Sequence, residues 1–167
     1  MATPPEPPRA PVSAPAWVTA VPATTAVVRD VVPMAALRDF FDASFRDLAR
    51  VLASQGIAVV GPAFGRYRGP LGPPGATVDL EVGFVTDRAV RPDGSVVPGT
   101  LPGGRTARLT HAGAFDGLAA SWERLRAWIE EQGLSPLTDR WEVYVTQPTP
   151  ETDPATLRTE LNWPVAD

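Results

Sequence analysis

The stretch Phe41-Asp-Ala-Ser-Phe-Arg-Asp-Leu-Ala-Arg-Val-Leu-Ala-Ser-Gln-Gly56 decides the fold, because its pattern returns further along the chain. Its apolar residues recur every three or four positions, which is the spacing of an amphipathic helix, and its last residue is a glycine, which ends helices. The same spacing returns 77 residues later and again ends at Gln-Gly, with Gly133 as the glycine. In both copies a tyrosine follows eleven residues after the glycine, Tyr67 in the first copy and Tyr144 in the second.

This repetition favours an internal duplication over coincidence. Many unrelated helices share apolar spacing, but the matched glutamine–glycine ends and the matched tyrosines are a more specific signal. The shift superimposes Phe41, Phe45, Leu48 and Leu52 on Leu118, Trp122, Leu125 and Ile129. Two fused copies of a strand–helix–strand–strand unit would build one antiparallel sheet with both helices on the same face. We therefore predict an α+β fold with two long helices on one face of the sheet and a ligand groove on the other.

Local patterns predict the remaining elements. The first helix begins after Pro33, since a proline fits the first helical turn. Runs of β-branched or alternating residues predict strands at 21–32, 57–60, 63–68, 78–84, 96–101, 105–111, 141–146 and 158–163. A glycine- and proline-rich loop is expected at 69–75. Residues 1–16 are a proline-rich lead that we expect to be flexible, and residues 17–167 form one domain.

Composition excludes several classes of function. The 167 residues carry a net charge of −4, so the chain has no basic surface for nucleic acid and no direct nucleic-acid binding is expected. The sequence contains no cysteine, no lysine and one histidine, which excludes thiolate catalysis, Schiff-base catalysis and a multi-histidine metal site. No metal or cofactor is therefore predicted. The sequence has neither a signal peptide nor an apolar run of the roughly 20 residues that a membrane helix needs. We expect a cytoplasmic protein with no membrane partner.

One predicted strand carries the strongest candidate site. Its period of two sends Trp141 and Val143 to the face that we expect to meet the helices, and Glu142 and Tyr144 to the uncovered face. Tyr67 is the equivalent of Tyr144 in the first copy. A carboxylate among aromatic rings suits a cationic aromatic molecule, because a ring attracts a cation by ~0.5–2 kcal/mol and the carboxylate neutralises its charge. The alternative is that Glu142 is merely the solvent side of a half-exposed strand.

Three further residues complete the candidate ligand-binding set. Glu81, on the alternating strand at 78–84, is a weaker acidic candidate, and its alternative is an exposed strand carboxylate. Phe84 lies on the same strand. Trp163 is either a wall of the pocket or an ordinary core residue. Trp122 is interpreted as a packing residue of the second helix.

Several segments together resemble the GyrI-like domain, which is the effector-binding domain of AraC- and MerR-type regulators. The likeness covers about residues 16–165, and its motifs occur in the order of the family. They are Gly61-Pro-Ala-Phe-Gly-Arg-Tyr67, Val78-Asp-Leu-Glu-Val-Gly-Phe-Val85, Leu101-Pro-Gly-Gly, His111-Ala-Gly-Ala-Phe-Asp-Gly-Leu118, Trp141-Glu-Val-Tyr144 and Thr159-Glu-Leu-Asn-Trp-Pro-Val165.

The resemblance implies a tandem-repeat sheet with a ligand groove along its pseudo-twofold axis. It also implies that Glu142 contacts the ligand, as the acid of this strand does in drug-sensing members, and that Tyr67, Tyr144 and Trp163 are the aromatic walls. Regulators of this type carry a helix-turn-helix domain before the effector domain, whereas only the proline-rich lead precedes it here. We therefore expect a stand-alone member whose partner is a small molecule, with a separate regulator or a homodimer as further partners.

The resemblance leaves three functions open. The first and preferred one is a small-molecule sensor or sequestering protein of the multidrug-binding type. The second is a hydrolase of reactive cyclopropane-type genotoxins, in which Glu142 is the catalytic residue that activates water. The third is an interaction protein like the gyrase-inhibitory members. Convergence of Glu81 and Glu142 on one cleft would favour hydrolysis, a lone Glu142 favours binding, and an exposed apolar patch outside the groove would favour the interaction protein.

Overall fold

The computed structural model describes residues 14–68, 77–114, 117–146, 151 and 153–166, and every structural statement below concerns these residues. The proline-rich lead up to residue 13 lies outside the described residues, and so does the loop expected at 69–75. No helix in the described ranges is both long enough and apolar enough to span a membrane.

The described chain forms eight strands and two long helices. The strands are β1 (Ala16–Ala20), β2 (Ala23–Pro33), β3 (Val59–Tyr67), β4 (Thr77–Thr86), β5 (Val97–Leu101), β6 (Gly104–Ala112), β7 (Arg140–Tyr144) and β8 (Arg158–Pro164). The helices are α1 (Leu37–Gln55) and α2 (Leu118–Glu131), and short 3-10 turns are η1 (Met34–Ala36) and η3 (Pro154–Thr156). All strands belong to one antiparallel sheet, in the order β1-β6-β8-β7-β3-β4-β2-β5.

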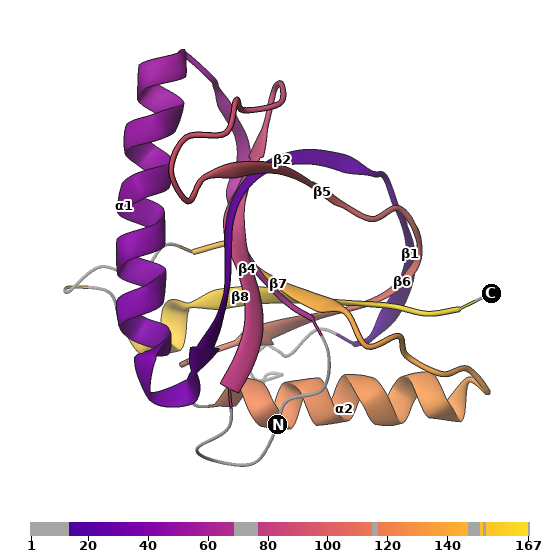
Figure 1. Cartoon of the computed structure of the whole chain (residues 1–167). Coiled ribbons are helices and arrows are strands. Elements are labelled where there is room, and N and C mark those ends of the chain that lie inside the picture. The colour runs from indigo at the N-terminus through magenta and orange to yellow at the C-terminus, as the bar shows by residue number, and fades with distance from the viewer. Residues whose placement is uncertain (1–13, 69–76, 115–116, 147–150, 152, 167) are drawn as a thin grey trace, which may run out of the picture.

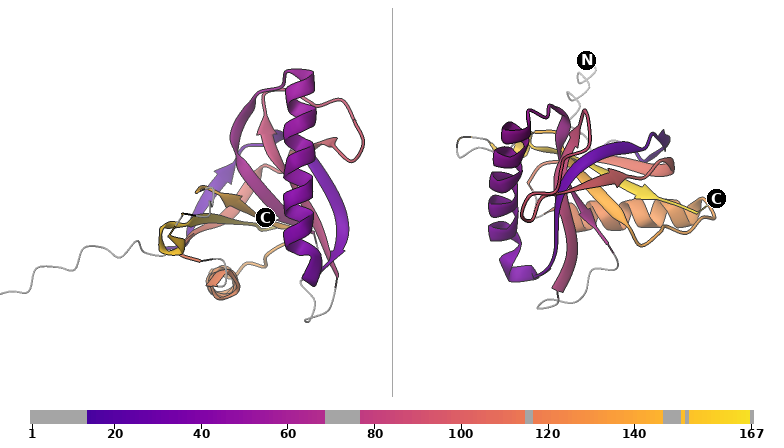
Figure 2. Two further views of the ribbon diagram at one scale, coloured as in Figure 1. Left: turned by 90° about the vertical axis from the view of Figure 1, so that its left-hand side faces the viewer. Right: turned by 45° about the horizontal axis from the view of Figure 1, so that its top comes forward.

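The sheet curls, and both helices lie outside the curl (Figure 1). Helix α1 covers the half that contains β2 and β4, while α2 covers the half that contains β6 and β8. The two helices run in different directions, as the side view in Figure 2 shows. We call the helix-covered face of the sheet the outer face and the face inside the curl the inner face.

The strand order confirms the predicted duplication. It is symmetric about its centre, since β3, β4, β2 and β5 on one side correspond to β7, β8, β6 and β1 on the other. The two central strands are neighbours, and Gly65 of β3 lies directly opposite Glu142 of β7. These two residues are also 77 positions apart. The pseudo-twofold axis therefore passes between Gly65 and Glu142.

Both faces of the sheet carry apolar packing. On the outer face, the cluster beneath α1 comprises Ala26, Val28, Leu48, Val51, Leu52, Ile57, Val78, Leu80, Val82, Val90 and Val96. The cluster beneath α2 comprises Ala107, Leu109, Trp122, Leu125, Ile129, Leu161, Trp163 and Val165. A third cluster is formed by Val27, Phe64, Leu101 and Trp141, which alternation along the strands places on the inner face. This curled sheet therefore buries apolar side chains on both of its faces.

Both helices end at the expected glycines. Helix α1 ends at Gln55, and Gly56 follows with a φ of 64°. Helix α2 ends at Glu131, and Gly133 has a φ of 77°. This left-handed conformation is one that glycine adopts without steric cost, which explains why both copies end at this residue type.

Two details differ from the sequence expectations. Strand β1 was not expected, yet it pairs with β6 at one edge of the sheet as β5 pairs with β2 at the other edge. The strands expected at 57–60 and 63–68 are one strand, β3, whose pairing with β4 shifts register between Val59 and Ala63. This shift spans the residues that separate the two strands expected from the sequence.

Candidate ligand-binding site

Glu142 is the carboxylate at the centre of the molecule. Its side chain is buried, with 4% of the residue exposed. One carboxylate oxygen, Oε1, accepts a hydrogen bond from Trp122 Nε1 at 3.0 Å. The other, Oε2, accepts one from the Tyr144 hydroxyl at 3.1 Å. Glu142 is therefore not a solvent-exposed strand carboxylate, which was the alternative that the sequence left open.

The structure corrects the face on which Glu142 and Tyr144 were expected. Trp122 belongs to α2, and the ring of Tyr144 packs against that of Phe41 from α1 at a centroid distance of 5.9 Å. Glu142 and Tyr144 thus lie on the helix-covered outer face, whereas Trp141 packs with the inner-face cluster. The sequence expectation failed because the inner face of the curled sheet is itself an apolar core, so apolar alternation does not identify the helix side.

Gly65 makes room for the site on the opposite strand. A Cβ atom at this position would lie 2.7 Å from the hydroxyl oxygen of Tyr144 and 3.3 Å from Cζ of Phe41. The absence of a side chain lets the Tyr144 hydroxyl lie over β3, where it reaches Glu142. Glu142 is therefore the carboxylate at the axis, and Gly65 is its equivalent in the first copy. The Tyr144 hydroxyl lies in the space that a side chain at Gly65 would occupy.

Arg140 lies beside this carboxylate, two residues earlier on the same face of β7. Its Cζ atom is 5.2–5.6 Å from the centres of three rings, those of Trp163, Trp122 and Tyr67. The residue is 6% exposed, and its Nε atom has no hydrogen-bond partner within the described part of the chain. The guanidinium is thus held by aromatic rings in a cation–π arrangement.

The ionisation of the site follows from burial. Desolvation raises the pKa of Glu142 above its ordinary value, and the hydrogen bonds from Trp122 and Tyr144 and the charge of Arg140 oppose this rise. Burial, together with the nearby carboxylate, also raises the pKa values of Tyr67 and Tyr144. Both phenols therefore remain protonated donors at neutral pH. Burial lowers the pKa of Arg140, an effect that Tyr67 and Glu142 partly offset.

The remaining aromatic candidates lie on the same outer face. The ring of Trp163 packs edge-on against Trp122 at 5.4 Å, and its Nε1 donates to the Leu137 carbonyl at 2.6 Å. Phe84 packs against Phe45 at 5.3 Å and belongs to the cluster beneath α1. A row of neighbouring rings leads back from Phe84 to the axis through Phe45, Phe41 and Tyr144.

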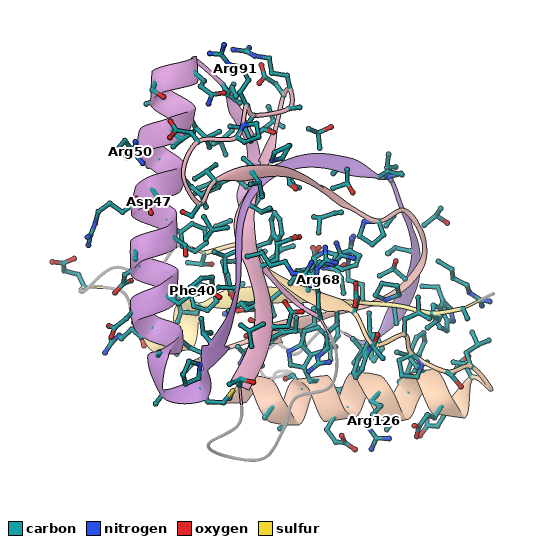
Figure 3. The ribbon with its side chains drawn as sticks, viewed as in Figure 1. Phe40, Asp47, Arg50, Arg68, Arg91 and Arg126 are labelled. Carbon is teal, nitrogen blue, oxygen red and sulfur yellow. The ribbon has the colours of Figure 1, made fainter. Side chains whose placement is uncertain are left out.

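Glu81 lies apart from this group. It is buried on the inner face, where it pairs with Arg68 at 3.1 Å and with Arg66 at 3.7 Å. Figure 3 shows Arg68 inside the curl, on the side of the sheet away from the helices. Glu81 and Glu142 therefore do not converge on one cleft. The described residues also contain no group of three or more histidine, aspartate or glutamate side chains that could hold a metal ion.

The inner face contains a hollow of its own. A cavity of about 320 Å³ is lined by Ala20, Val21, Ala23, Pro62, Phe64, Val85, Leu101, Pro102, Arg108, Trp141, Val143, Val145 and Glu160. The face opposite the helices thus holds a groove, as expected, but Glu142 and the aromatic candidates are not among its lining residues.

Sequence reasoning missed Arg140 and assigned Trp122 to packing alone. Arg140 immediately precedes the strand as it was predicted from sequence, so alternation was not extended to it. A period of two counted back from Glu142 places Arg140 on the same face. Nothing in the sequence distinguishes the indole of Trp122, which both packs in the core and donates to Glu142, from a purely apolar helix residue.

These features define a duplicated α+β domain with a buried carboxylate and aromatic rings at its axis. The chain belongs to the family described as the GyrI-like small molecule binding domain, whose model matches residues 19–166. The family resemblance inferred from the sequence motifs is thereby confirmed. A comparison with curated proteins gave no match.

Several solved structures share this fold at low sequence identity. The EcmrR C-terminal domain is 17% identical, with a TM-score of 0.79 over 92% of this chain and 97% of that chain. SAV2435 bound to tetraphenylphosphonium is 12% identical, with a TM-score of 0.65 over 92% and 94% of the two chains. A hydrolase encoded by lin2189 from Listeria innocua is 15% identical, with a TM-score of 0.64 over 94% of both chains. In the EcmrR–DNA complex, this chain covers 57% of the EcmrR chain.

Proposed function

We propose that this protein binds a small hydrophobic molecule, aromatic or cationic, at the outer face between α1 and α2, and that it acts as a sensor or a sequestering protein. The observation that carries the proposal is Glu142, a buried carboxylate on the pseudo-twofold axis that accepts hydrogen bonds from an indole and a phenol. Burying a carboxylate is costly, so a protein that keeps one among aromatic rings has a use for its charge.

The rings on the α1 side supply the apolar part of the site. Phe41, Phe45, Phe84 and Tyr144 are all half-buried, although each is a large aromatic residue. Half-buried rings that touch one another form a surface that an aromatic ligand can cover, which removes further apolar area from water. A ligand on this surface would lie beside the Tyr144 hydroxyl and the carboxylate that it contacts.

The membership in a small-molecule-binding family supports this proposal, and so does the tetraphenylphosphonium bound to SAV2435, a protein with the same fold. Tetraphenylphosphonium is a hydrophobic aromatic cation, and we therefore use it as the first probe. Other ligands would bind at the same site. A separate regulator or a homodimer partner would respond to the ligand bound there.

A matched pair of substitutions tests which face binds the ligand. Phe45→Ala truncates a half-buried residue on the outer face, and Val143→Ala truncates a half-buried residue that lines the inner cavity. Calorimetric titration with tetraphenylphosphonium should show an affinity loss of about tenfold for Phe45→Ala and little change for Val143→Ala, since a lost ring contact corresponds to ~1–2 kcal/mol. The reverse pattern would place the ligand in the inner cavity and would overturn the proposed site.

Hydrolysis is the second candidate, and one observation favours it. The pKa of Glu142 is raised by burial, as is required of a carboxylate that accepts a proton during catalysis near neutral pH. Against it, Glu81 lies on the other face of the sheet, where it pairs with Arg66 and Arg68. Mass analysis of reactive cyclopropane-type compounds incubated with the protein would decide, because turnover that disappears in Glu142→Gln requires the hydrolase.

A further inference from the structure

The cavity on the inner face is separate from the site around Glu142. All eight strands contribute at least one of its lining residues, whereas neither helix contributes any of those that the structure describes. Ala20 of β1 and Leu101 of β5, from opposite edges of the sheet, both line it because the sheet curls. Its volume of about 320 Å³ lies at the small end of the range for ligand pockets. The cavity therefore has the size for a small molecule.

The walls of this cavity are mostly apolar. Phe64 and Trp141 line it and belong to the buried cluster of the inner face. Two other lining residues are exposed to water, since Val21 is 81% exposed and Val145 is 54% exposed. A molecule in the cavity would pack against the buried rings and cover part of the exposed valines. Removing this apolar surface from water would favour binding.

Two charged residues, Arg108 and Glu160, line the same cavity. Arg108 pairs with Asn162 across β6 and β8, and Asn162 pairs with Trp141, so all three lie on the inner face. Nε of Arg108 donates to Oδ1 of Asn162 at 2.8 Å and lies 3.2 Å from Oε1 of Glu160. The same Oε1 accepts from Nδ2 of Asn162 at 3.2 Å. The two opposite charges thus neutralise each other beside the apolar walls.

Both charged groups retain hydrogen-bonding capacity. Among the described residues, no side chain or carbonyl accepts a hydrogen bond from the terminal nitrogens of Arg108, and no group donates one to Oε2 of Glu160. A ligand carboxylate would be attracted by Arg108 and repelled by Glu160, and a ligand cation would meet the reverse. An uncharged carboxamide suits both, because its oxygen accepts a hydrogen bond and its N–H donates one.

We propose that the inner cavity is a second binding site, which takes a small uncharged molecule with an apolar body and a carboxamide group. The apolar body packs between Phe64, Trp141 and the valines, while the amide oxygen accepts from Arg108 and the amide N–H donates to Glu160. This site goes beyond the proposed function, because it lies on the opposite face of β7 and selects against charge. Trp141 and Val143 of that strand line the inner cavity, and Glu142 and Tyr144 form the outer site.

The test compares naphthamide with naphthoate, which share one ring system and a planar head group but differ by one negative charge. Calorimetric titration of the full chain should show naphthamide binding about tenfold or more tightly than naphthoate. Glu160→Gln removes the negative charge from the cavity and keeps the shape of the side chain, so it should reverse this preference. Equal or tighter binding of naphthoate to the wild type, or an unchanged preference in folded Glu160→Gln, would overturn the inference.

A matched pair of variants assigns the naphthamide site to one face. Ala23 is a half-buried residue that lines the cavity, so Ala23→Phe should fill it and abolish naphthamide binding. Phe45→Ala, on the outer face, should leave naphthamide affinity within about twofold of the wild type. Naphthamide binding that survives in folded Ala23→Phe, or a larger loss in Phe45→Ala, would overturn the inference. If Ala23→Phe does not fold, the reversal expected of Glu160→Gln remains the deciding result.

Tetraphenylphosphonium separates this inference from the proposed function. Its affinity should fall in Phe45→Ala and stay near that of the wild type in Ala23→Phe, which is the opposite of the result expected for naphthamide. If tetraphenylphosphonium binds as proposed and naphthamide does not bind, only the second site is refuted. If naphthamide binds in the inner cavity and tetraphenylphosphonium does not bind at the outer face, only the proposed function is refuted.

Discussion

Substitution of Gly65 by alanine should disturb the site in a way that depends on one hydroxyl group. The new Cβ would lie 2.7 Å from the Tyr144 hydroxyl oxygen, a distance at which the hydroxyl must move. That hydroxyl donates to the buried Glu142 carboxylate, and a hydrogen bond to a charged group contributes about 1.5–3 kcal/mol. Alanine in a strand recovers about 0.5–1 kcal/mol of backbone entropy relative to glycine. We therefore expect Gly65→Ala to lower the free energy of unfolding by about 1–2 kcal/mol.

A double-mutant cycle with Tyr144→Phe isolates this effect. Removing the hydroxyl removes the 2.7 Å contact and leaves the 3.3 Å approach to Phe41, which a small ring shift can relieve. In the Tyr144→Phe background, Gly65→Ala should therefore cost at least about 1 kcal/mol less than it does in the wild type.

Urea denaturation followed by tryptophan fluorescence gives the four free energies of unfolding. A cost of Gly65→Ala that is the same in both backgrounds would refute the reasoning, because it would mean that the Tyr144 hydroxyl does not occupy the space above Gly65. A cost that disappears in the Tyr144→Phe background would locate the conflict at that hydroxyl, as the geometry requires.

Three other outcomes follow from the structure. Because the pKa of Glu142 is raised in the folded state, its stabilising contribution is complete below the ordinary glutamate pKa and is lost as pH rises through the raised value. Glu142→Gln should therefore become more stable relative to the wild type as pH rises through that window in urea titrations, and a constant difference would contradict the raised pKa. Leu48→Ala and Leu125→Ala, each in a fully buried core position beneath one helix, should each lower the free energy of unfolding by about 2–5 kcal/mol, and a cost below 1 kcal/mol would contradict tight packing there. Gly56→Ala should lower the midpoint of thermal unfolding through a cost of about 1 kcal/mol, because its φ is 64°, and an unchanged midpoint would contradict this conformation.

The helices and the duplication were predictable because they depend on local spacing. The apolar positions that pack beneath α1 and α2 recur at helical intervals, and Gly56 and Gly133 end both copies in the same backbone conformation. The tyrosine and glutamine–glycine matches then gave the offset of 77 residues, which the symmetric strand order reproduces. Long-range symmetry could be read from the sequence because the duplication left the same local signals twice.

The face on which Glu142 lies could not be predicted, because alternation separates two sets of residues without showing which set faces the helices. A period of two separates Trp141 from Glu142, but which set meets the helices depends on curvature, and the inner face of this sheet buries Trp141. Whether Glu81 and Glu142 share a face likewise depends on the pairing register between strands. Two strand patterns taken separately do not contain that register. Arg140 was missed for a related reason, since its role depends on rings from β3, α2 and β8 that meet only in the fold.

The affinity of the protein for tetraphenylphosphonium, measured for the wild type, Glu142→Gln and Glu81→Gln, tests the central claim most directly. Both glutamates are buried to the same extent, with 4% of each exposed, but Glu142 lies on the outer face and Glu81 on the inner face. We predict that Glu142→Gln weakens binding by about tenfold or more, the loss expected when a buried carboxylate no longer neutralises a cation, while Glu81→Gln stays within about twofold of the wild type. Unchanged affinity in folded Glu142→Gln, or a greater loss in Glu81→Gln, would contradict the assignment of the site to Glu142.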